Sequence, residues 1–443
     1  MPEADALRLS DAAELERAGA EMLELMRKLY PLCRSLTGDG VRETLRIVGE
    51  IVPLTVTEVP SGTPVFDWTV PREWNVADAW IAGADGRRLV DFRASSLHVV
   101  GYSGPVRARV SGAELQSHLH SLPEHPDWVP ARTAYWEETW GFCLSERQRQ
   151  AIEPGAEYDV CIDSRLVDGS LTYAEALIEG ERGEEVLLST YVCHPSLCND
   201  NLSGIVLLAA LGRRLSGLRP RYTYRLLFSP GTIGPLAWLS RNLERLERIA
   251  AGLAVSCAGD PGPIRYKRSR RGSAEIDRAA AHVLRHSRPD AHVSDFVPWG
   301  GDERQFCSPG FDLPVGALTR TPHGCYPEYH SSADGFELVR AESLADSLAC
   351  ALEILDVLER DAVHVSRNPY GEPQLGRRGL YRELGGGEEE EEDAFQRALL
   401  WTLNLGDGAH SLLDVAERAE LPFALVADAA AALVTAGLVE RAR

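Results

Sequence analysis

The chain has 443 residues, of which 66 are acidic and 46 are basic, and its formal net charge is −20 at pH 7. This excess of negative charge argues against non-specific attraction to nucleic acid or to an anionic membrane, because both are polyanionic. The length exceeds what one ordinary hydrophobic core organises, so we expect two or three domains.

The sequence also indicates a compartment. No apolar run is long enough to span a bilayer, and the first thirty residues lack the continuous apolar core of a signal peptide. The nine cysteines are scattered and form no CxxC pair, which is typical of reduced thiols rather than of a disulfide framework. We therefore expect a cytoplasmic protein with no membrane partner.

In chain order, the first predicted elements are helices, because apolar residues recur at helical spacing from about residue 12 to 52. From about 55 to 165, Pro, Gly, Trp and short alternating runs dominate, which predicts a small β-rich domain. A βα pattern with glycine-rich strand ends follows. We expect a discontinuous α/β catalytic domain, residues 12–55 and 166–362, that holds an inserted β-rich domain of residues 56–165.

The C-terminal part is predicted to be a linker followed by a winged helix. Three glycines and five glutamates between Gly385 and Asp393 cannot bury apolar area, so residues 363–393 are expected to form a flexible, extended linker. Residues 394–443 follow the rhythm of helix, turn, helix and wing. The candidate reading helix, residues 422–437, contains no Lys or Arg, which favours a structural or protein-contact role over DNA binding.

The stretch Val186–Gly204, VLLSTYVCHPSLCNDNLSG, predicts a short buried strand, a polar loop and a buried helix. His194 ends the strand-like run, and Asp200 follows six residues later. An imidazole and a carboxylate at a strand end can hold a divalent metal. Alternatively, Asp200 is only a helix cap and His194 a hydrogen-bonded loop histidine. Cys193 is expected to point away from His194, which disfavours a soft-metal role.

Further candidate ligands follow neighbouring strands. The run GLAVSCAG ends on Asp260, and FDLPVGALTR ends near His323, with His330 a few residues further on. Ligands collect beyond the carboxyl ends of parallel strands in an open α/β sheet, so these side chains are expected at one edge. Two imidazoles and two carboxylates suit zinc and other borderline divalent metals. The expected metal ligands are His194, Asp200, Asp260 and His330.

Several long phrases carry a resemblance that covers nearly the whole chain. They include FDWTVPREWNVADAWI (66–81), SSLHVVGYSGPV (95–106), STYVCHPSLCNDNLSG (189–204), GGDERQFCSPGFDLPVGALTR (300–320) and YPEYHSSAD (326–334). The chain resembles bacterial aminopeptidase-like proteins that combine a zinc-exopeptidase domain, an inserted domain and a C-terminal winged helix. This resemblance implies an α/β fold of the zinc-exopeptidase (phosphorylase/hydrolase-like) type, with a mixed sheet flanked by helices.

The resemblance also implies roles for individual residues. It relates the chain to co-catalytic zinc aminopeptidases, glutamate carboxypeptidases and glutaminyl cyclases, and the four expected ligands match the ligands of those enzymes. Such a metal polarises the scissile carbonyl and lowers the pKa of water. Asp302 and Glu303 match the family's DER phrase and would line the pocket. Tyr329 would donate a hydrogen bond to an oxyanion, or would simply pack at the strand end.

The chain departs from this pattern after the strand TYRLLFS. Relatives of this family read Pro-Glu-Thr-Ile-Gly there, whereas this chain has Gly231 and Thr232 after Pro230. Glycine cannot accept a proton, and the loss of a positioned general base typically costs about 10²–10⁴-fold in rate. The wider group of aminopeptidases has a second Glu at the position of Thr232, so its absence favours one zinc over two.

Three hypotheses follow. The chain is a zinc-dependent hydrolase of a small peptide or aminoacyl amide in which Glu303, or another nearby carboxylate, is the base. Alternatively, it is a biosynthetic enzyme that performs acyl transfer or cyclisation on the same scaffold. The third hypothesis is a non-catalytic metal-binding or regulatory protein. The sequence leaves the oligomeric state open, a homo-oligomer included.

Overall fold

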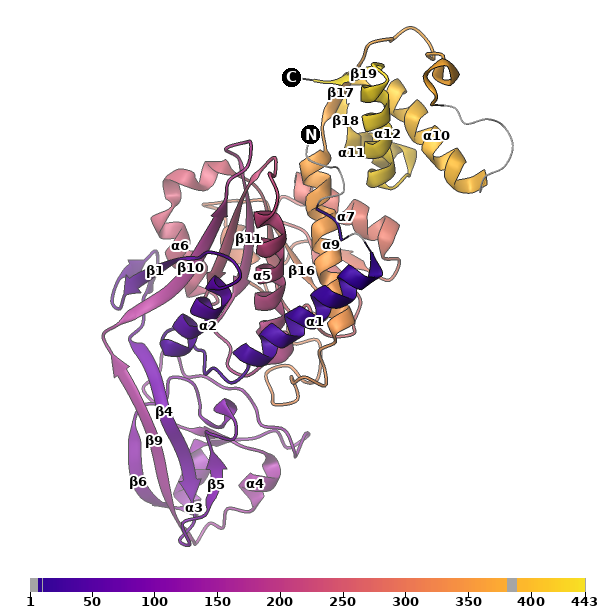
Figure 1. The fold of residues 1–443 in the computed structure, drawn as a ribbon. Helices are drawn as coiled ribbons and strands as arrows, with labels where there is room; N and C mark the ends of the chain where they lie inside the picture. Colours follow the sequence, from indigo (N-terminus) through magenta and orange to yellow (C-terminus); the bar gives the residue numbers. More distant parts are fainter. Residues whose placement is uncertain (1–6, 10, 381–388, 443) are drawn as a thin grey trace.

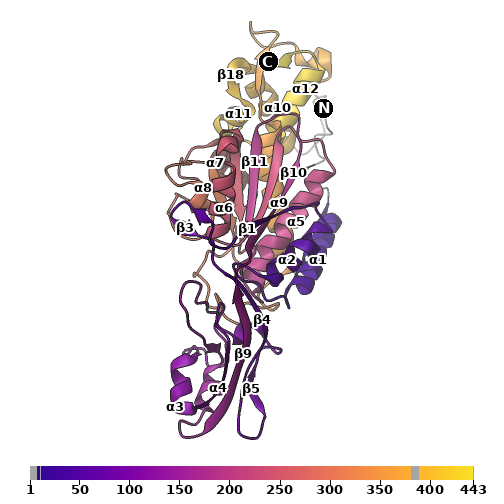
Figure 2. The same cartoon turned by 90° about the vertical axis from the view of Figure 1, so that its left-hand side faces the viewer.

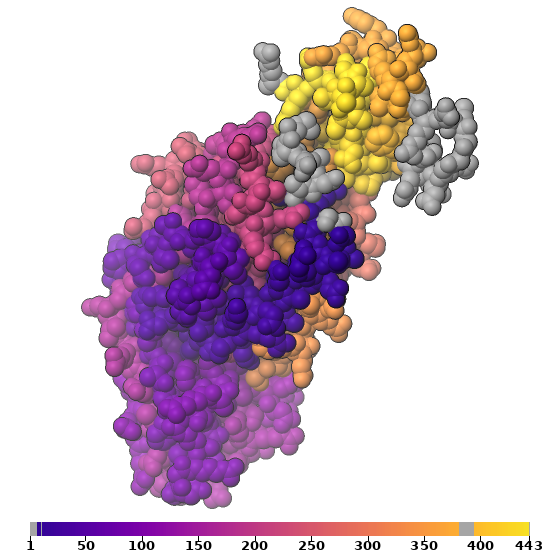
Figure 3. Space-filling model, viewed as in Figure 1, coloured from indigo at the N-terminus to yellow at the C-terminus, as the bar shows by residue number. Residues whose placement is uncertain are grey.

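The computed structural model describes residues 7–9, 11–380 and 389–442. Three parts follow one another along an elongated molecule, with the inserted domain at one end and the winged helix at the other (Figures 1 and 3). The predicted linker over residues 363–393 falls partly on residues 381–388, which lie outside the described residues.

The central part contains a mixed eight-stranded sheet in the order β1-β10-β12-β11-β13-β16-β14-β15. The four strands β12, β11, β13 and β16 are mutually parallel, whereas β1 and β10 pair antiparallel with their neighbours. The strand β14 pairs antiparallel with β16 and parallel with β15. The strand bounds are β1 Thr55–Pro60, β10 Ser170–Ile178, β11 Glu185–Tyr191, β12 Thr223–Ser229, β13 Ile249–Val255, β14 Arg265–Lys267, β15 His292–Ser294 and β16 Val315–Thr319. Every residue of β11, β12 and β16 is buried, as expected for strands covered on both faces.

Helices cover both faces of this sheet (Figure 2). One core contains apolar side chains from α1 Ala12–Leu29, α2 Asp39–Gly49, α5 Ser203–Ser216, α7 Glu275–Ser287 and α9 Ala341–Arg360. A second core contains side chains from α6 Ile233–Arg241 and α8 Glu303–Phe306 and continues into the inserted domain. The mixed sheet with flanking helices confirms the predicted fold class.

The inserted domain is built on a four-stranded antiparallel sheet in the order β5-β4-β9-β6. These strands are β4 Glu73–Ala82, β5 Arg88–Asp91, β6 Val106–Ser111 and β9 Glu157–Val167. The smaller elements are β2 Pro64–Val65, β3 Trp68–Thr69, α3 Gly112–Leu115, β7 Leu119–His120, β8 Phe142–Cys143 and α4 Glu146–Gln150. The β-rich texture is therefore observed, but Thr55–Pro60 pairs with β10 and belongs to the central sheet.

The C-terminal part has the winged-helix architecture expected from the sequence. Its helices are α10 Glu389–Asn404, α11 Leu412–Ala419 and α12 Phe423–Thr435, and its strands are β17 Val363–Ser366, β18 Asp407–Ser411 and β19 Val439–Arg441. The predicted linker must be corrected at both ends. Val363–Ser366 is the middle strand of the three-stranded sheet, and α10 already begins at Glu389.

Within the described ranges, no helix is both long and apolar enough to cross a membrane. All nine cysteines are free thiols, as their scattered positions predict.

Candidate metal centre

Two loops at the carboxyl edge of the sheet bring three potential metal ligands together. His194 follows β11, Asp200 lies in the short helical turn Cys198–Leu202 before α5, and His330 lies in the loop between β16 and α9. His330 Nε2 lies 2.9 Å and His194 Nε2 lies 3.9 Å from Asp200 Oδ2. The Asp200 carboxylate is fully buried, whereas the His194 and His330 side chains are 21% and 37% exposed. The cluster therefore opens to solvent on its histidine side.

The protonation states of this cluster suit cation binding. Burial lowers the pKa of His194 to about 4, so its imidazole is neutral at pH 7 and keeps a lone pair for a cation. Burial alone would raise the pKa of Asp200, but the imidazoles of His194 and His330 outweigh that effect and hold it below its usual range. The cluster thus presents one carboxylate and neutral imidazole nitrogen to the same point.

The backbone of each histidine is fixed by a separate part of the chain. The guanidinium of Arg34, itself buried, donates from Nε to the carbonyl oxygen of His194 at 2.8 Å. The inserted domain reaches the other histidine, because Ala131 N donates to the His330 carbonyl oxygen at 2.7 Å. Pro130 and Ser331 form an antiparallel bridge beside this bond. The inserted domain therefore positions the loop that carries His330.

A buried phenol and imidazole orient Asp200. The Tyr191 hydroxyl donates to Asp200 Oδ1, and His323 Nε2 lies 2.8 Å from the same hydroxyl. Because the single phenolic proton goes to Asp200, His323 donates its own Nε2 proton to Tyr191. Asp334 accepts from the backbone N–H groups of Asn199 and Asp200 at 2.5 and 2.9 Å, which ties the His330 loop to the Asp200 loop.

A second group of potential ligands shares Asp200 and adds Cys257 and His323. Burial raises the pKa of the Cys257 thiol well above its usual value, so this sulfur is protonated and a poor ligand at pH 7. His323 is already engaged with Tyr191. The His194, Asp200 and His330 group is therefore the better metal site of the two.

The predicted ligand Asp260 is not brought into either group among the residues that the structure describes. Its Oδ1 accepts from Gly262 N at 2.8 Å and from Thr321 Oγ1 at 2.6 Å, and its Oδ2 accepts from Asn199 Nδ2 and Thr321 N, both at 3.0 Å. The strand β13 ends at Val255, so Cys257, rather than Asp260, lies beside the cluster. Asp260 braces the surrounding loops.

Asp302 and Glu303 are both buried but have different partners. Glu303 Oε1 forms an ion pair with Lys267 Nζ at 2.5 Å. Asp302 Oδ1 accepts from Thr232 N at 2.8 Å, while its Oδ2 is buried and has no hydrogen-bond partner within the described residues. Burial raises the pKa of Asp302 to about 7. Asp302 can therefore gain and lose a proton near neutral pH.

Gly231 lies at the end of β12, one residue before Thr232. Its N–H donates to Cys193 Sγ at 3.2 Å, and a Cβ at this position would lie 3.3 Å from that sulfur and 3.6 Å from Tyr191 Cβ. A side chain here would therefore project toward the end of β11. Cys193 Sγ lies 3.6 Å from His194 Nδ1, so it is closer to the imidazole than strand alternation predicts, but it is outside both ligand groups.

Tyr329 is placed beside the cluster. Its ring stacks on the His330 imidazole with centroids 4.0 Å apart and an interplanar angle of 12°. Burial raises the pKa of its hydroxyl, which remains protonated. Tyr329 thus fixes the plane of His330, and its predicted hydrogen bond to an oxyanion stays a prediction.

Sequence reasoning did not assign Tyr191, Cys257 or the bracing role of Asp334. A tyrosine hydroxyl at the last position of a fully buried strand was the available signal for Tyr191. Cys257 looked like any other buried thiol, because the predicted strand continued past it.

Comparison with known proteins places this chain in a family. A family profile described as "Domain of unknown function (DUF4910)" matches residues 23–361, and a winged helix-turn-helix profile matches residues 362–441. A protein of Clostridium acetobutylicum, provisionally described as a polysaccharide biosynthesis protein with an aminopeptidase-like domain, is 46% identical over 422 residues, or 95% of this chain and 96% of that protein.

Solved structures show the same fold. A crystal structure from Clostridium acetobutylicum, provisionally described as that of a peptidase, is 43% identical with a TM-score of 0.92 and covers 97% of this chain and 98% of that chain. The zinc aminopeptidase of Bacillus subtilis is 10% identical with a TM-score of 0.57 and covers 77% of this chain and 94% of that chain. The resemblance noted in the sequence is therefore confirmed, and the fold is that of the zinc aminopeptidases.

Proposed function

The chain belongs to the family of the domain of unknown function DUF4910, and we propose that within this family it is a single-zinc amide hydrolase acting on small peptides or aminoacyl amides. The observation that carries the proposal is the convergence of His194, Asp200 and His330 at the carboxyl edge of an aminopeptidase-type sheet. This edge is where α/β enzymes of this kind bind their ligands.

The donor atoms fit a zinc ion. Asp200 Oδ2 and His330 Nε2 are buried and, although 2.9 Å apart, neither makes a hydrogen bond to any described residue. Two nitrogens and one oxygen with an open solvent side are typical of catalytic zinc, which keeps one position free. A cation held there would polarise a carbonyl group and lower the pKa of water.

The proton transfers are assigned to Asp302. Its free Oδ2 and its pKa of about 7 allow it to accept a proton from the attacking water and return it to the departing amine. The Thr232 N–H donates to the other carboxylate oxygen of Asp302. Thr232 directly follows Gly231, which stands where relatives have the base. We assign this role to Asp302 rather than to Glu303, because Glu303 Oε1 is ion-paired with Lys267.

The function is tested by loading the purified chain with zinc and assaying a panel of dipeptides and aminoacyl-p-nitroanilides. We expect about one zinc per chain and hydrolysis that is lost on chelation and restored by zinc. His330→Asn should remove both zinc and activity, whereas the exposed control Arg340→Gln should keep both. Zinc bound at one per chain with no hydrolysis of any substrate would contradict the hydrolase.

A second candidate is a biosynthetic enzyme that transfers an acyl group or cyclises its substrate. It is favoured by two observations: the Gly231 departure from the hydrolytic pattern, and the description of the Clostridium acetobutylicum relative as a polysaccharide biosynthesis protein. An assay that follows transfer of the acyl group from an amide to an amino sugar, with release of the free carboxylic acid by hydrolysis measured in parallel, separates the two. Transfer exceeding hydrolysis would favour this candidate.

A further inference from the structure

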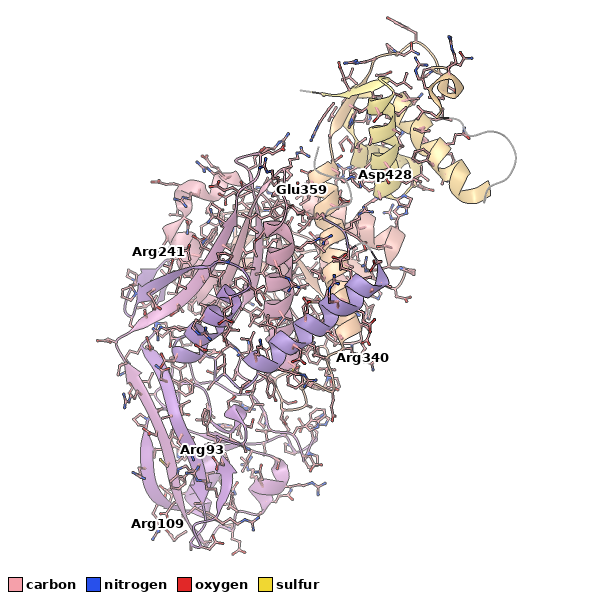
Figure 4. The ribbon with its side chains drawn as sticks, viewed as in Figure 1. Arg93, Arg109, Arg241, Arg340, Glu359 and Asp428 are labelled. Atoms are coloured by element: carbon pink, nitrogen blue, oxygen red, sulfur yellow. The ribbon has the colours of Figure 1, made fainter. Side chains whose placement is uncertain are left out.

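A cavity lies where the winged helix meets the aminopeptidase-like domain, at the C-terminal end of α9. Glu359 on α9 and Asp428 on α12 mark the two sides of this junction (Figure 4). Arg360 on α9 bridges it by an ion pair to Asp428 on α12. The cavity between the two parts, here called the junction cavity, has a volume of about 230 Å³.

The walls of the junction cavity are mostly apolar. On one side, α12 presents the small side chains Ala427, Ala430 and Ala431, with Val434 39% exposed at the mouth. On the other side, Leu7 and Leu218 come from the aminopeptidase-like domain. Because alanine is short, α12 leaves space that larger residues would have filled by direct packing. This space is below the roughly 300–1,000 Å³ of sites for drug-sized ligands.

Arginines that lack acidic partners gather at the rim. Within the described chain, Arg219 and Arg441 are exposed and form no ion pair or hydrogen bond through their side chains. Arg221 donates to the carbonyl oxygens of Leu358 and Asp361, but its buried Nε has no described partner. Burial and the guanidiniums of Arg221 and Arg182 lower the pKa of Arg441, which shows that positive charge is concentrated here.

The acidic groups nearby do not neutralise all of this charge. Glu359 accepts from the backbone N–H of Arg221 and Tyr222 and from the Tyr224 hydroxyl, so its oxygens are occupied. Asp356 pairs with Arg8 and Arg360. Glu181 is the remaining carboxylate of the lining. Among the described lining residues, three guanidiniums therefore accompany one uncommitted carboxylate, in a chain whose net charge is −20.

We propose that the junction cavity is a binding site for a small amphipathic anion, whose apolar body packs against α12 and whose carboxylate or phosphate contacts Arg219, Arg221 and Arg441. Guanidinium groups bind both kinds of anion through paired N–H donors. The site does not depend on the proposed hydrolase. It lies at the end of α9 remote from the metal loops, since α9 is 20 residues long and spans roughly 30 Å.

The test measures binding to the full-length, zinc-loaded chain by calorimetry. Octanoate and octyl phosphate probe the two anions, octylammonium and octanol carry the same apolar chain without negative charge, and inorganic phosphate lacks the chain. Arg219→Gln combined with Arg441→Gln removes two exposed cations at the rim. Arg93→Gln combined with Arg109→Gln removes the same charge at the far end of the inserted domain (Figure 4).

We expect one equivalent of octanoate or octyl phosphate to bind, and the tighter of the two to identify the preferred anion. The rim double variant should weaken binding at least tenfold, whereas the inserted-domain double variant should change it less than twofold. Ala430→Leu, which fills the cavity, should also abolish binding. The proposal would be overturned if octanol bound as tightly as the anions, or if the rim double variant bound them as tightly as the unaltered chain. It would also be overturned if the anions bound only after deletion of residues 1–6. None of these measurements depends on catalysis, so the hydrolase and this site can fail separately.

Discussion

The two halves of the candidate active site are built differently. In the ligand half, His194, Asp200 and His330 come from loops that are fixed by Arg34, Asp334 and the inserted domain. In the proposed proton-transfer half, Gly231 stands where relatives have the base, and Asp302, whose Oδ2 has no described hydrogen-bond partner, comes from a different segment. On the proposed function, cation binding and proton transfer are carried by separate loops, so one can change while the other is preserved.

The largest expected effect is the loss of bound zinc when the ligand half is altered. Asp200→Asn removes the only charged oxygen of the His194, Asp200 and His330 cluster, so zinc should fall from about one equivalent per chain to background and activity should be lost. Asp260→Asn is the matched control, because Asp260 is hydrogen-bonded outside the cluster, and it should keep its zinc. Elemental analysis of both dialysed variants measures this. Equal zinc loss in both would restore Asp260 as a ligand.

The next largest expected effect is a fall in kcat when only the proton-transfer half is altered. Asp302→Asn should lower kcat by about 10²–10⁴-fold while zinc stays bound, because the amide cannot accept a proton. Glu303→Gln should cost less, since Glu303 is paired with Lys267 and does not transfer the proton. A larger loss in Glu303→Gln than in Asp302→Asn would assign the base to Glu303, as the sequence alone suggested.

The pH dependence supplies a second readout for Asp302. Its raised pKa means that it is protonated below about 7, so kcat/KM should fall as the pH drops below that value and the fall should vanish in Asp302→Asn. A bound cation lowers the pKa of a nearby carboxyl, which would move the transition to lower pH. In the metal-free protein, Asp302 loses its proton at a lower pH in the unfolded chain than in the folded one. The free energy of unfolding should therefore fall as the pH rises from about 4 to 7.

A smaller effect sharpens the role of the buried groups behind the ligands. Tyr191→Phe removes the hydroxyl that donates to Asp200 and leaves the ring that fills the strand end. Outer-shell partners of metal ligands typically contribute 10–100-fold in affinity. We expect zinc affinity, measured by competition with a chelator, to fall about 10–100-fold at unchanged stoichiometry. An unchanged affinity would show that Tyr191 only packs.

The structure brings together three of the four predicted ligands, His194, Asp200 and His330, and their role as ligands stays a prediction. The sequence indicated them because short buried strands and their polar ends can be recognised locally. Asp260 lies outside the cluster because β13 ends at Val255, earlier than its apolar pattern suggests. The choice between Asp302 and Glu303 depends on Lys267, which is distant in sequence and meets Glu303 only in the fold. Local patterns cannot supply that pairing.

The same limit explains the C-terminal correction. Val363–Ser366 reads as the start of a polar linker, yet it pairs with β18 and β19, which follow more than forty residues later. Strand pairing at that separation leaves no local signal, whereas the helices α11 and α12 were visible from their amphipathic spacing. The helical start of α10 at Glu389 was missed because a run of glutamates is typical of solvated, extended chain.

The smallest expected effect asks whether the two halves can be recombined. Gly231→Glu should be accommodated, because its Cβ would meet Cys193 Sγ at 3.3 Å and would require only a small shift of that side chain. In the Asp302→Asn background, the new carboxylate should recover activity about tenfold, since it returns a proton acceptor to the end of β12. Gly231→Gln in the same background is the control and should recover none, because it matches glutamate in size but cannot take the proton. Recovery by both would indicate a packing effect, and recovery by neither would mean that a side chain at position 231 does not reach the reacting atoms.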